Sequence, residues 1–163
     1  MESPKITLVS GLDLSTKDFT IKVRIIRLWR RRMNQNGNES CSIEMILLDE
    51  QGNKIHAVVY PNFFPKFEKQ LQEKVCLIIQ KPRIEKNSTT YKYVDSPLKL
   101  SLNGATTVKK CDSFSGSLYG FSFTGFQPIL DRAIAENSTI GLCTILLYRK
   151  KTYDIKRFSS FIT

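Results

Sequence analysis

The sequence predicts an all-β fold, a small closed five-stranded Greek-key barrel with one helix between the third and fourth strands. Three observations support this prediction. Residues 43–60 read as a β-hairpin, strand-like alternation flanks the hairpin, and one helical stripe follows it. A chain of 163 residues, 41% of them hydrophobic, is long enough to bury one full core of this kind.

The hairpin in residues 43–60 organises the rest of the chain. Two β-type runs flank a polar turn at residues 49–53, where Gly52 is free to take a positive φ. In the second run, the apolar face carries Ile55, Ala57 and Val59. The opposite face carries Lys54, His56, Val58 and Tyr60. This opposite face is basic and ends in an aromatic ring, so we expect it to meet a charged ligand that can stack.

The first strand is expected at residues 19–28. Its alternation breaks at the adjacent pair Ile25 and Ile26, and a bulge there would switch faces and bend the strand, as a small barrel requires. Residues 27–32 then carry four arginines around Trp29, and residues 33–40 read as a flexible polar loop. This segment is either a solvated basic loop or a loop that grips phosphate through bidentate guanidinium contacts.

A short helix is expected at residues 64–73, because Phe64, Phe67 and Leu71 form an i, i+3, i+7 stripe. A fourth strand follows at residues 75–84, with Pro82 at an edge or bulge, and a fifth at residues 98–102. This order of elements is that of the oligonucleotide/oligosaccharide-binding (OB) fold. In that fold, ligands bind on the second and third strands and on the loops beside them.

The composition limits the classes of function. The formal net charge of +10 favours a polyanionic partner or an acidic membrane surface. No apolar run is long enough to span a bilayer, so we expect no membrane partner. The four cysteines lie far apart and the chain has one histidine, so we expect neither a zinc site nor another cofactor. No Walker-type loop or catalytic spacing is visible, so we do not expect an enzyme.

Four segments, residues 21–29, 44–57, 67–75 and 106–111, resemble the first DNA-binding OB domain of the replication protein A large subunit. They look closest to the plant-type set of these domains, and the resemblance covers about residues 5–112. Its most specific part is the run Leu-Leu-Asp-Glu-x-Gly-x-x-Ile-x-Ala placed after Arg-Leu-Trp. The resemblance implies binding of single-stranded DNA with little sequence preference, in DNA replication, repair or recombination, and a nuclear location.

The resemblance also implies site residues. Two stacking aromatics fall on Tyr60 and Tyr91, and basic contacts fall on Arg27, His56 and Arg83. His56 stands where the family usually has arginine, and Lys99 stands where it often has an acid. With the outward-facing lysine and the basic loop, the predicted nucleic-acid-binding set is Arg27, Arg30, Arg31, Arg32, Lys54, His56, Tyr60, Arg83, Tyr91 and Lys99.

The chain is expected to change character after residue 112. Residues 1–112 form the predicted OB domain, and residues 113–163 are predicted to hold a linker and the truncated start of a second OB-like segment. Alternatively, residues 113–163 fold back onto the first barrel. Other functions stay open: the barrel could be a protein-interaction module that takes an acidic peptide, or an RNA-binding module. Other replication protein A-like subunits are possible partners.

Overall fold

The computed structural model describes residues 5–35, 38–88 and 92–121, together with residues 127 and 131. Strands dominate the described residues, and helix α1 lies between the third and fourth strands, so the all-β prediction is confirmed. The elements are η1 (Val9–Gly11), β1 (Thr20–Gln35), β2 (Asn38–Asp49), β3 (Lys54–Val59), η2 (Pro61–Phe63), α1 (Phe64–Phe67), β4 (Cys76–Gln80), β5 (Arg83–Lys86), β6 (Leu98–Leu102) and β7 (Thr107–Lys110).

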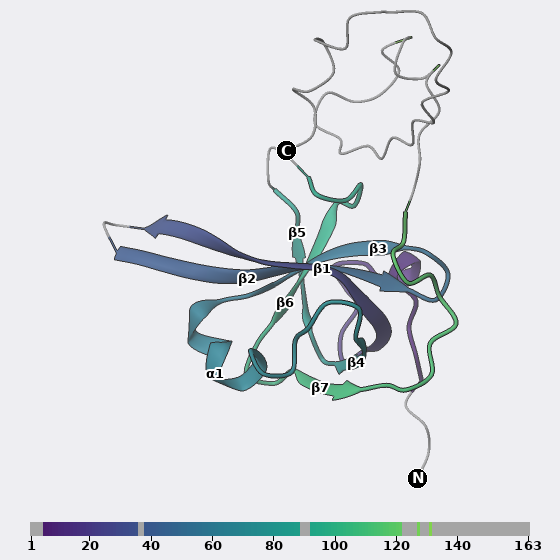
Figure 1. The fold of residues 1–163 in the computed structure, drawn as a ribbon, viewed down its shortest axis with the longest axis horizontal. Helices are drawn as coiled ribbons and strands as arrows, with labels where there is room; N and C mark the ends of the chain where they lie inside the picture. The colour runs from purple at the N-terminus through teal and green to yellow at the C-terminus, as the bar shows by residue number, and fades with distance from the viewer. Residues whose placement is uncertain (1–4, 36–37, 89–91, 122–126, 128–130, 132–163) are drawn as a thin grey trace, which may run out of the picture.

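The strands form one sheet in the order β5-β6-β3-β2-β1-β4-β7. Among these named strands, β3 and β6 pair in parallel and the other neighbours are antiparallel. The predicted fourth strand is divided at Pro82 into β4, which pairs with β1, and β5, which pairs with β6. The corner between them uses Lys81 at φ 53°. This corner links β5, at one edge of the sheet, to β4, next to the other edge, so the sheet curls round into a barrel-like shape (Figure 1).

The predicted bulge in β1 is confirmed. Ile25 pairs with Leu47 and Arg27 with Ile46, so Ile26 is the extra residue. Before the bulge the odd-numbered residues of β1, such as Val23, face the core. After it, the odd-numbered residues face outward, which places Arg27, Trp29 and Arg31 on the outside of the barrel.

The core fills the barrel with inward-facing aliphatic side chains and a few aromatic rings. Its fully buried members include the predicted apolar face of β3, Ile55, Ala57 and Val59. The hairpin turn before β3 is also as predicted, with Gly52 at φ 90° and the Asp49 carboxylate accepting the backbone N–H groups of Gln51 and Asn53.

The helix is shorter than predicted: α1 ends at Phe67, whereas the stripe predicted residues 64–73. The backbone bonding tightens after Phe67, because the amide of Gln70 donates to the Phe67 carbonyl three residues back. Phe67 and Leu71 are still buried, at 0% and 5% exposure. The stripe therefore identified the core contacts correctly but not the length of the helix.

The predicted loop, formed by Arg30–Arg32 and residues 33–40, is wrong for most of its length. β1 and β2 continue through this segment and pair residue by residue from Arg27–Ile46 to Gln35–Asn38. Their outer part projects from the barrel as a two-stranded ribbon (Figure 1). A ribbon outside the barrel has no core to cover, so it needs no apolar alternation, and its polar sequence reads as a loop.

The segment after β7 lies against the barrel as far as Gly120. The Arg24 guanidinium donates to the carbonyl oxygens of Gly116 and Ser117 at 3.0 and 2.9 Å. A Cβ on Gly120, which has φ 60°, would come within 3.0 Å of the Leu48 side chain, so only glycine allows this close approach. These contacts lie beside the bulge. The predicted domain boundary at residue 112 stays a prediction, and most of the predicted second segment lies outside the described residues.

In the part of the chain that the structure describes, no helix is both long and apolar enough to cross a membrane.

Candidate nucleic-acid interface

The outward-facing side chains of five neighbouring strands form one surface, which we call the outer wall. The strand registers align these residues in two adjacent rows that cross the sheet. One row contains Arg27, Ile46, His56, Lys99 and Glu85 on β1, β2, β3, β6 and β5. The next row contains Trp29, Glu44, Val58, Ser101 and Arg83 on the same strands. At the usual strand spacing each row is about 19 Å wide.

An aromatic cluster stands on this wall. Trp29 and His56 lie nearly parallel, with ring centroids 6.1 Å apart and planes at 4°. Tyr93, from the loop between β5 and β6, places its ring at 70° to Trp29 and 69° to His56, with centroids at 4.8 and 5.2 Å. Offset and edge-to-face arrangements of this kind are favourable, and they hold the loop against the wall.

Tyr60 follows β3 directly and is half-buried at the same wall. Its hydroxyl group donates to the Glu85 carboxylate at 3.3 Å. The Ser101 hydroxyl donates to the other oxygen of Glu85 at 2.7 Å, and the Lys99 ammonium lies 3.6 Å from the oxygen that Tyr60 contacts. These contacts bring the Tyr60 side chain, predicted for base stacking, close to Glu85 of β5 and to Ser101 and Lys99 of β6.

Glu44 is a buried carboxylate in the middle of the wall. It accepts from the Ser42 hydroxyl at 3.1 Å, lies 2.9 Å from Nε2 of His56, and pairs with Arg31 at 3.6 Å. Burial raises the pKa of the Glu44 carboxyl, but the hydrogen bonds and charges of His56, Ser42 and Arg31 outweigh it. The pKa therefore lies below its ordinary value, and the carboxylate is held ionised.

His56 lies on the predicted face but is only 2% exposed, because Trp29 and Tyr93 cover it. Its Nε2 is engaged by Glu44, and its Nδ1 is buried with no hydrogen-bond partner. The side chain is therefore not open to solvent as the expected basic contact would be, and contact with nucleic acid stays a prediction. Strand alternation predicts the face on which His56 lies. It does not predict that His56 is buried, because the rings that cover it come from other elements.

The predicted cationic side chains differ in whether they form an ion pair with an acidic residue. Lys99 is paired with Glu85, Arg31 with Glu44, and Arg30 with Glu68. The members that make no ion pair with any described residue are Arg27, Arg32, Lys54 and Arg83. Arg27 and Arg83 are exposed at opposite ends of the two rows, so the wall has free positive charge at both edges.

The arginines of the predicted loop are divided between the two faces of the ribbon. Arg31 shares the outward phase of Trp29 and reaches Glu44. Arg30 points to the opposite face, where it pairs with Glu68 and lies 5.9 Å from the centre of the Phe64 ring. By alternation Arg32 is on the same face as Arg30. Grouping the three as one basic loop was wrong, because a strand sends successive side chains in opposite directions.

Tyr91, the second predicted stacking residue, lies outside the described residues, so its position relative to Tyr60 is untested. Tyr93, which stands two positions away in the same loop and belongs to the aromatic cluster, was not among the predicted site residues. Nor were Glu44 and Glu85. Both carboxylates could be identified from the strand register, because it places them in the same rows as the predicted cations.

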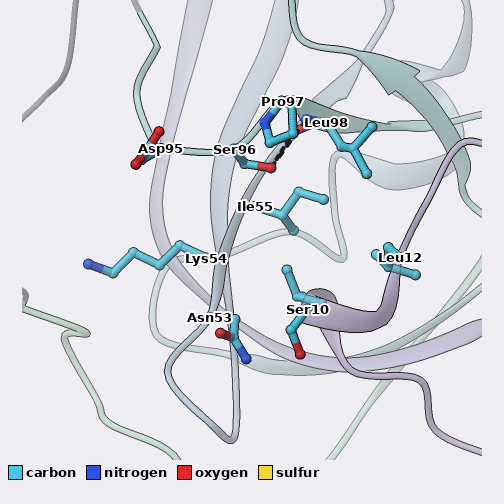
Figure 2. Close-up of a pocket in the computed structure, with 10 residues that line it drawn as sticks. Ser10, Leu12, Asn53, Lys54, Ile55, Asp95, Ser96, Pro97 and Leu98 are labelled. Atoms are coloured by element: carbon cyan, nitrogen blue, oxygen red, sulfur yellow. Dashed lines mark hydrogen bonds between the residues drawn. The ribbon is translucent and has the colours of Figure 1, made fainter. Parts of the chain in front are cut away.

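A shallow hollow of about 320 Å³ lies at one end of the wall, between η1, the β2–β3 turn and the β5–β6 loop. Figure 2 shows Ile55 at its floor, with Ser10, Asn53 and Ser96 around the rim and Lys54 extending away from it. The hollow therefore adds one basic side chain at its edge but no cluster of charges. Among the described residues, no group of three or more His, Cys, Asp and Glu side chains could hold a metal ion.

Comparisons with known proteins place this fold. The family described as "Domain of unknown function DUF223" matches residues 11–132. The chain belongs to this DUF223 family. No curated protein is similar enough in sequence to give a significant match.

Two solved structures have a fold similar to that of this DUF223 chain. One is a replication protein A heterotrimer bound to single-stranded DNA, with a TM-score of 0.64 at 20% identity; the alignment covers 77% of this chain and 29% of that chain. The other is DNA-binding domain A of Saccharomyces cerevisiae replication protein A, with a TM-score of 0.54 at 21% identity. That alignment covers 70% of this chain and 100% of the domain. The predicted OB fold is thereby confirmed.

Proposed function

We propose that this DUF223 protein binds single-stranded DNA on the outer wall, with little dependence on sequence for most of its contacts. The observation that carries the proposal is the wall itself. Its two rows combine an exposed arginine at each edge with aromatic side chains between them. Solved structures of similar fold are a replication protein A heterotrimer bound to single-stranded DNA and the DNA-binding domain A of replication protein A.

The proposed mechanism divides the work between rings and cations. Tyr60, Trp29 and Tyr93, together with Tyr91, offer faces on which unpaired bases stack, each worth about 1–3 kcal/mol. Arg27, Arg83 and Lys54 neutralise phosphates along the strand, because they have no acidic partner among the described residues. Duplex DNA keeps its bases stacked internally, so the wall selects single strands.

The wider biological role follows the same proposal. We place the protein with plant-type replication protein A-like factors of the nucleus, acting in DNA replication, repair or recombination. One barrel contacts only a few nucleotides, so high affinity requires a second barrel or another subunit on the same strand. The chain spans 29% of the replication protein A chain that it matches, which is consistent with one module of a larger assembly.

Fluorescence anisotropy tests the proposal with labelled oligo-dT, oligo-rU and duplex DNA of equal length across a salt series. We expect oligo-dT to bind more tightly than duplex at every salt concentration. The double substitution Tyr60→Ala with Tyr91→Ala should weaken oligo-dT binding more than tenfold, because two stacking faces are lost. Circular dichroism checks that the variant is folded.

Three results would contradict the proposal. They are equal affinity for duplex and oligo-dT, unchanged oligo-dT binding by the folded double variant, and tight binding of an acidic peptide that oligo-dT does not displace. Tighter binding of oligo-rU than of oligo-dT would reassign the ligand to RNA. A salt dependence alone does not count as support, because any basic protein shows one.

A further inference from the structure

Glu85 is an unusual group for a surface that binds phosphates. It stands in the first row of the wall, and its side chain is 26% exposed. Its partners are the Ser101 hydroxyl at 2.7 Å, the Tyr60 hydroxyl at 3.3 Å and the Lys99 ammonium at 3.6 Å. A negative charge at this point opposes a passing phosphate, so its presence needs another reason.

The contacts of Glu85 leave it able to accept more hydrogen bonds. An ionised carboxylate has about four acceptor positions, and three groups approach this one. The two contacts to Oε2, at 3.3 and 3.6 Å, are longer than a good charge-assisted hydrogen bond. Glu44, the other carboxylate of the wall, is only 5% exposed and is engaged at both oxygens, so it is closed to a ligand.

The position of Glu85 relative to Tyr60 defines what it could read. The carboxylate lies at the hydroxyl end of the Tyr60 ring. A base stacked on that ring brings its Watson–Crick edge to the ring perimeter, which is where single-stranded nucleic acids are read by hydrogen bonding. Lys99 lies beside the carboxylate, so the protein presents two acceptor oxygens next to one donor nitrogen.

Guanine is the base that matches this pattern. Its Watson–Crick edge carries two neighbouring donors, N2–H and N1–H, followed by the acceptor O6. Thymine has one donor between two acceptors, and both of its carbonyl oxygens would face a carboxylate unfavourably. Adenine and cytosine each offer one amino donor beside an acceptor nitrogen. Only guanine therefore pairs both carboxylate oxygens and the ammonium group at once.

We propose that Glu85, with Lys99, makes the Tyr60 position of the wall selective for guanine. This inference rests on the proposed function, because it needs a single strand stacked on Tyr60. It goes beyond that function by assigning one position of the strand a base preference within an otherwise tolerant surface. The two carboxylate oxygens of Glu85 accept from N1–H and N2–H, and Lys99 donates to O6.

Competition binding tests the inference. Unlabelled oligonucleotides displace labelled oligo-dT from the protein. The competitors are oligo-dT itself and a series in which a single dG replaces dT at each position in turn. We expect the best-placed dG to bind about tenfold more tightly than dT, the usual size of one good base contact. Deoxyinosine at that position keeps N1–H and O6 but lacks the amino group, so it should recover only part of the gain. This comparison uses the wild-type protein and needs no substitution.

Variants then assign the preference to Glu85. Glu85→Gln replaces one acceptor oxygen with an amino donor, so the dG-to-dT affinity ratio should fall toward one. The matched control is Glu68→Gln, which removes an exposed carboxylate that pairs with Arg30 away from the wall, and it should keep the ratio. The inference is overturned if the dG-to-dT affinity ratio of the wild type is near one, or if Glu85→Gln keeps the wild-type ratio. In either case, normal binding of oligo-dT would leave the proposed function standing. Failure of every oligonucleotide to bind would overturn both.

Discussion

The Glu44 carboxylate shows how single residues hold the outer wall together. It links Ser42 on its own strand, His56 on β3 and Arg31 on β1. A buried carboxylate without such partners would be costly, so the three contacts keep it charged and fix the side chains around it. The Trp29 ring lies over His56, so the geometry of the aromatic cluster depends on this carboxylate as well.

A pH series on Glu44→Gln tests this role. Because contacts with His56, Ser42 and Arg31 lower the pKa of Glu44 in the folded protein despite its burial, the wild type gains stability above the ordinary pKa of 4.5. That stability is lost as the pH falls through the lowered folded pKa. Glu44→Gln should reduce the free energy of unfolding by about 1–3 kcal/mol at pH 7.

Urea denaturation at pH 7 and at pH 3 measures the effect on Glu44→Gln. The difference between wild type and variant should shrink at the lower pH, because the unfolded state binds a proton at the ordinary pKa of 4.5 while the lowered pKa of the folded carboxyl resists it. Glu68→Gln, which changes an exposed carboxylate, serves as the control and should stay close to wild type at both values. An equal difference at both pH values would show that the charge of Glu44 is not what stabilises the wall.

Individual residues of the wall were predictable to different extents. Strand alternation correctly placed Lys54, His56 and Tyr60 on one outward face. It could not predict that His56 is buried, because its cover comes from Trp29 on β1 and Tyr93 in a distant loop. Exposure of a side chain depends on which elements meet over it, and a local pattern carries no information about that.

At the scale of elements, the β1–β2 ribbon is the largest departure from the prediction. The bulge at Ile26 was predictable, because two adjacent apolar residues interrupt an alternating strand. The continuation to Gln35 was not, because the paired strands beyond the barrel bury no core and carry no apolar period. The bulge and the ribbon together sort the arginines, so that Arg27 and Arg31 face the wall and Arg30 faces α1.

Alanine substitutions on the ribbon strand test this sorting. Arg27→Ala removes an exposed guanidinium of the wall that has no described acidic partner. It should weaken oligo-dT binding severalfold and lower the slope of log K against log salt by about 0.7, as expected for one lost phosphate contact with a single strand.

The matched control for this strand is Arg30→Ala, which is equally exposed but pairs with Glu68 on the side of α1. It should leave both affinity and salt slope near the wild-type values. Anisotropy titrations at several salt concentrations give both quantities. If the two variants lose the same affinity and the same salt slope, both faces of the ribbon contribute equally to binding. The assignment of the outer wall as the binding face would then be wrong.

At the scale of the molecule, the closed barrel was predictable and the docking of the following segment was not. The order of hydrophobic runs specified the barrel, and Pro82 marked the corner where the fourth strand divides. Apart from Phe114, residues 113–117 are serine and glycine, as in a linker. Three of the segment's hydrogen bonds to Arg24 and Glu50 use backbone groups, which the identity of a side chain does not reveal. The Phe114 ring also lies 4.4 Å from the Arg24 guanidinium, a contact that its place in a linker-like run did not predict.

The described part of that segment lies beside the β1 bulge, against Ile26 and Leu48. The first row begins at Arg27 and Ile46, beside this contact, and both rows extend from there across β3, β6 and β5. The molecule thus combines a net charge of +10 with a wall that carries free arginines at its edges and aromatic rings between them. The proposed binding of single-stranded DNA depends on this combination.

Intrinsic fluorescence tests the account most directly, because Trp29 is the only tryptophan of the chain and stands on the wall. Unlabelled oligo-dT is added to the wild-type protein, and the emission is compared with the anisotropy curve of labelled oligo-dT. The account predicts saturable quenching with the same midpoint as the anisotropy curve, since bases stack beside the indole ring. Unchanged emission over the range where anisotropy reports full binding would place the nucleic acid elsewhere and contradict the account.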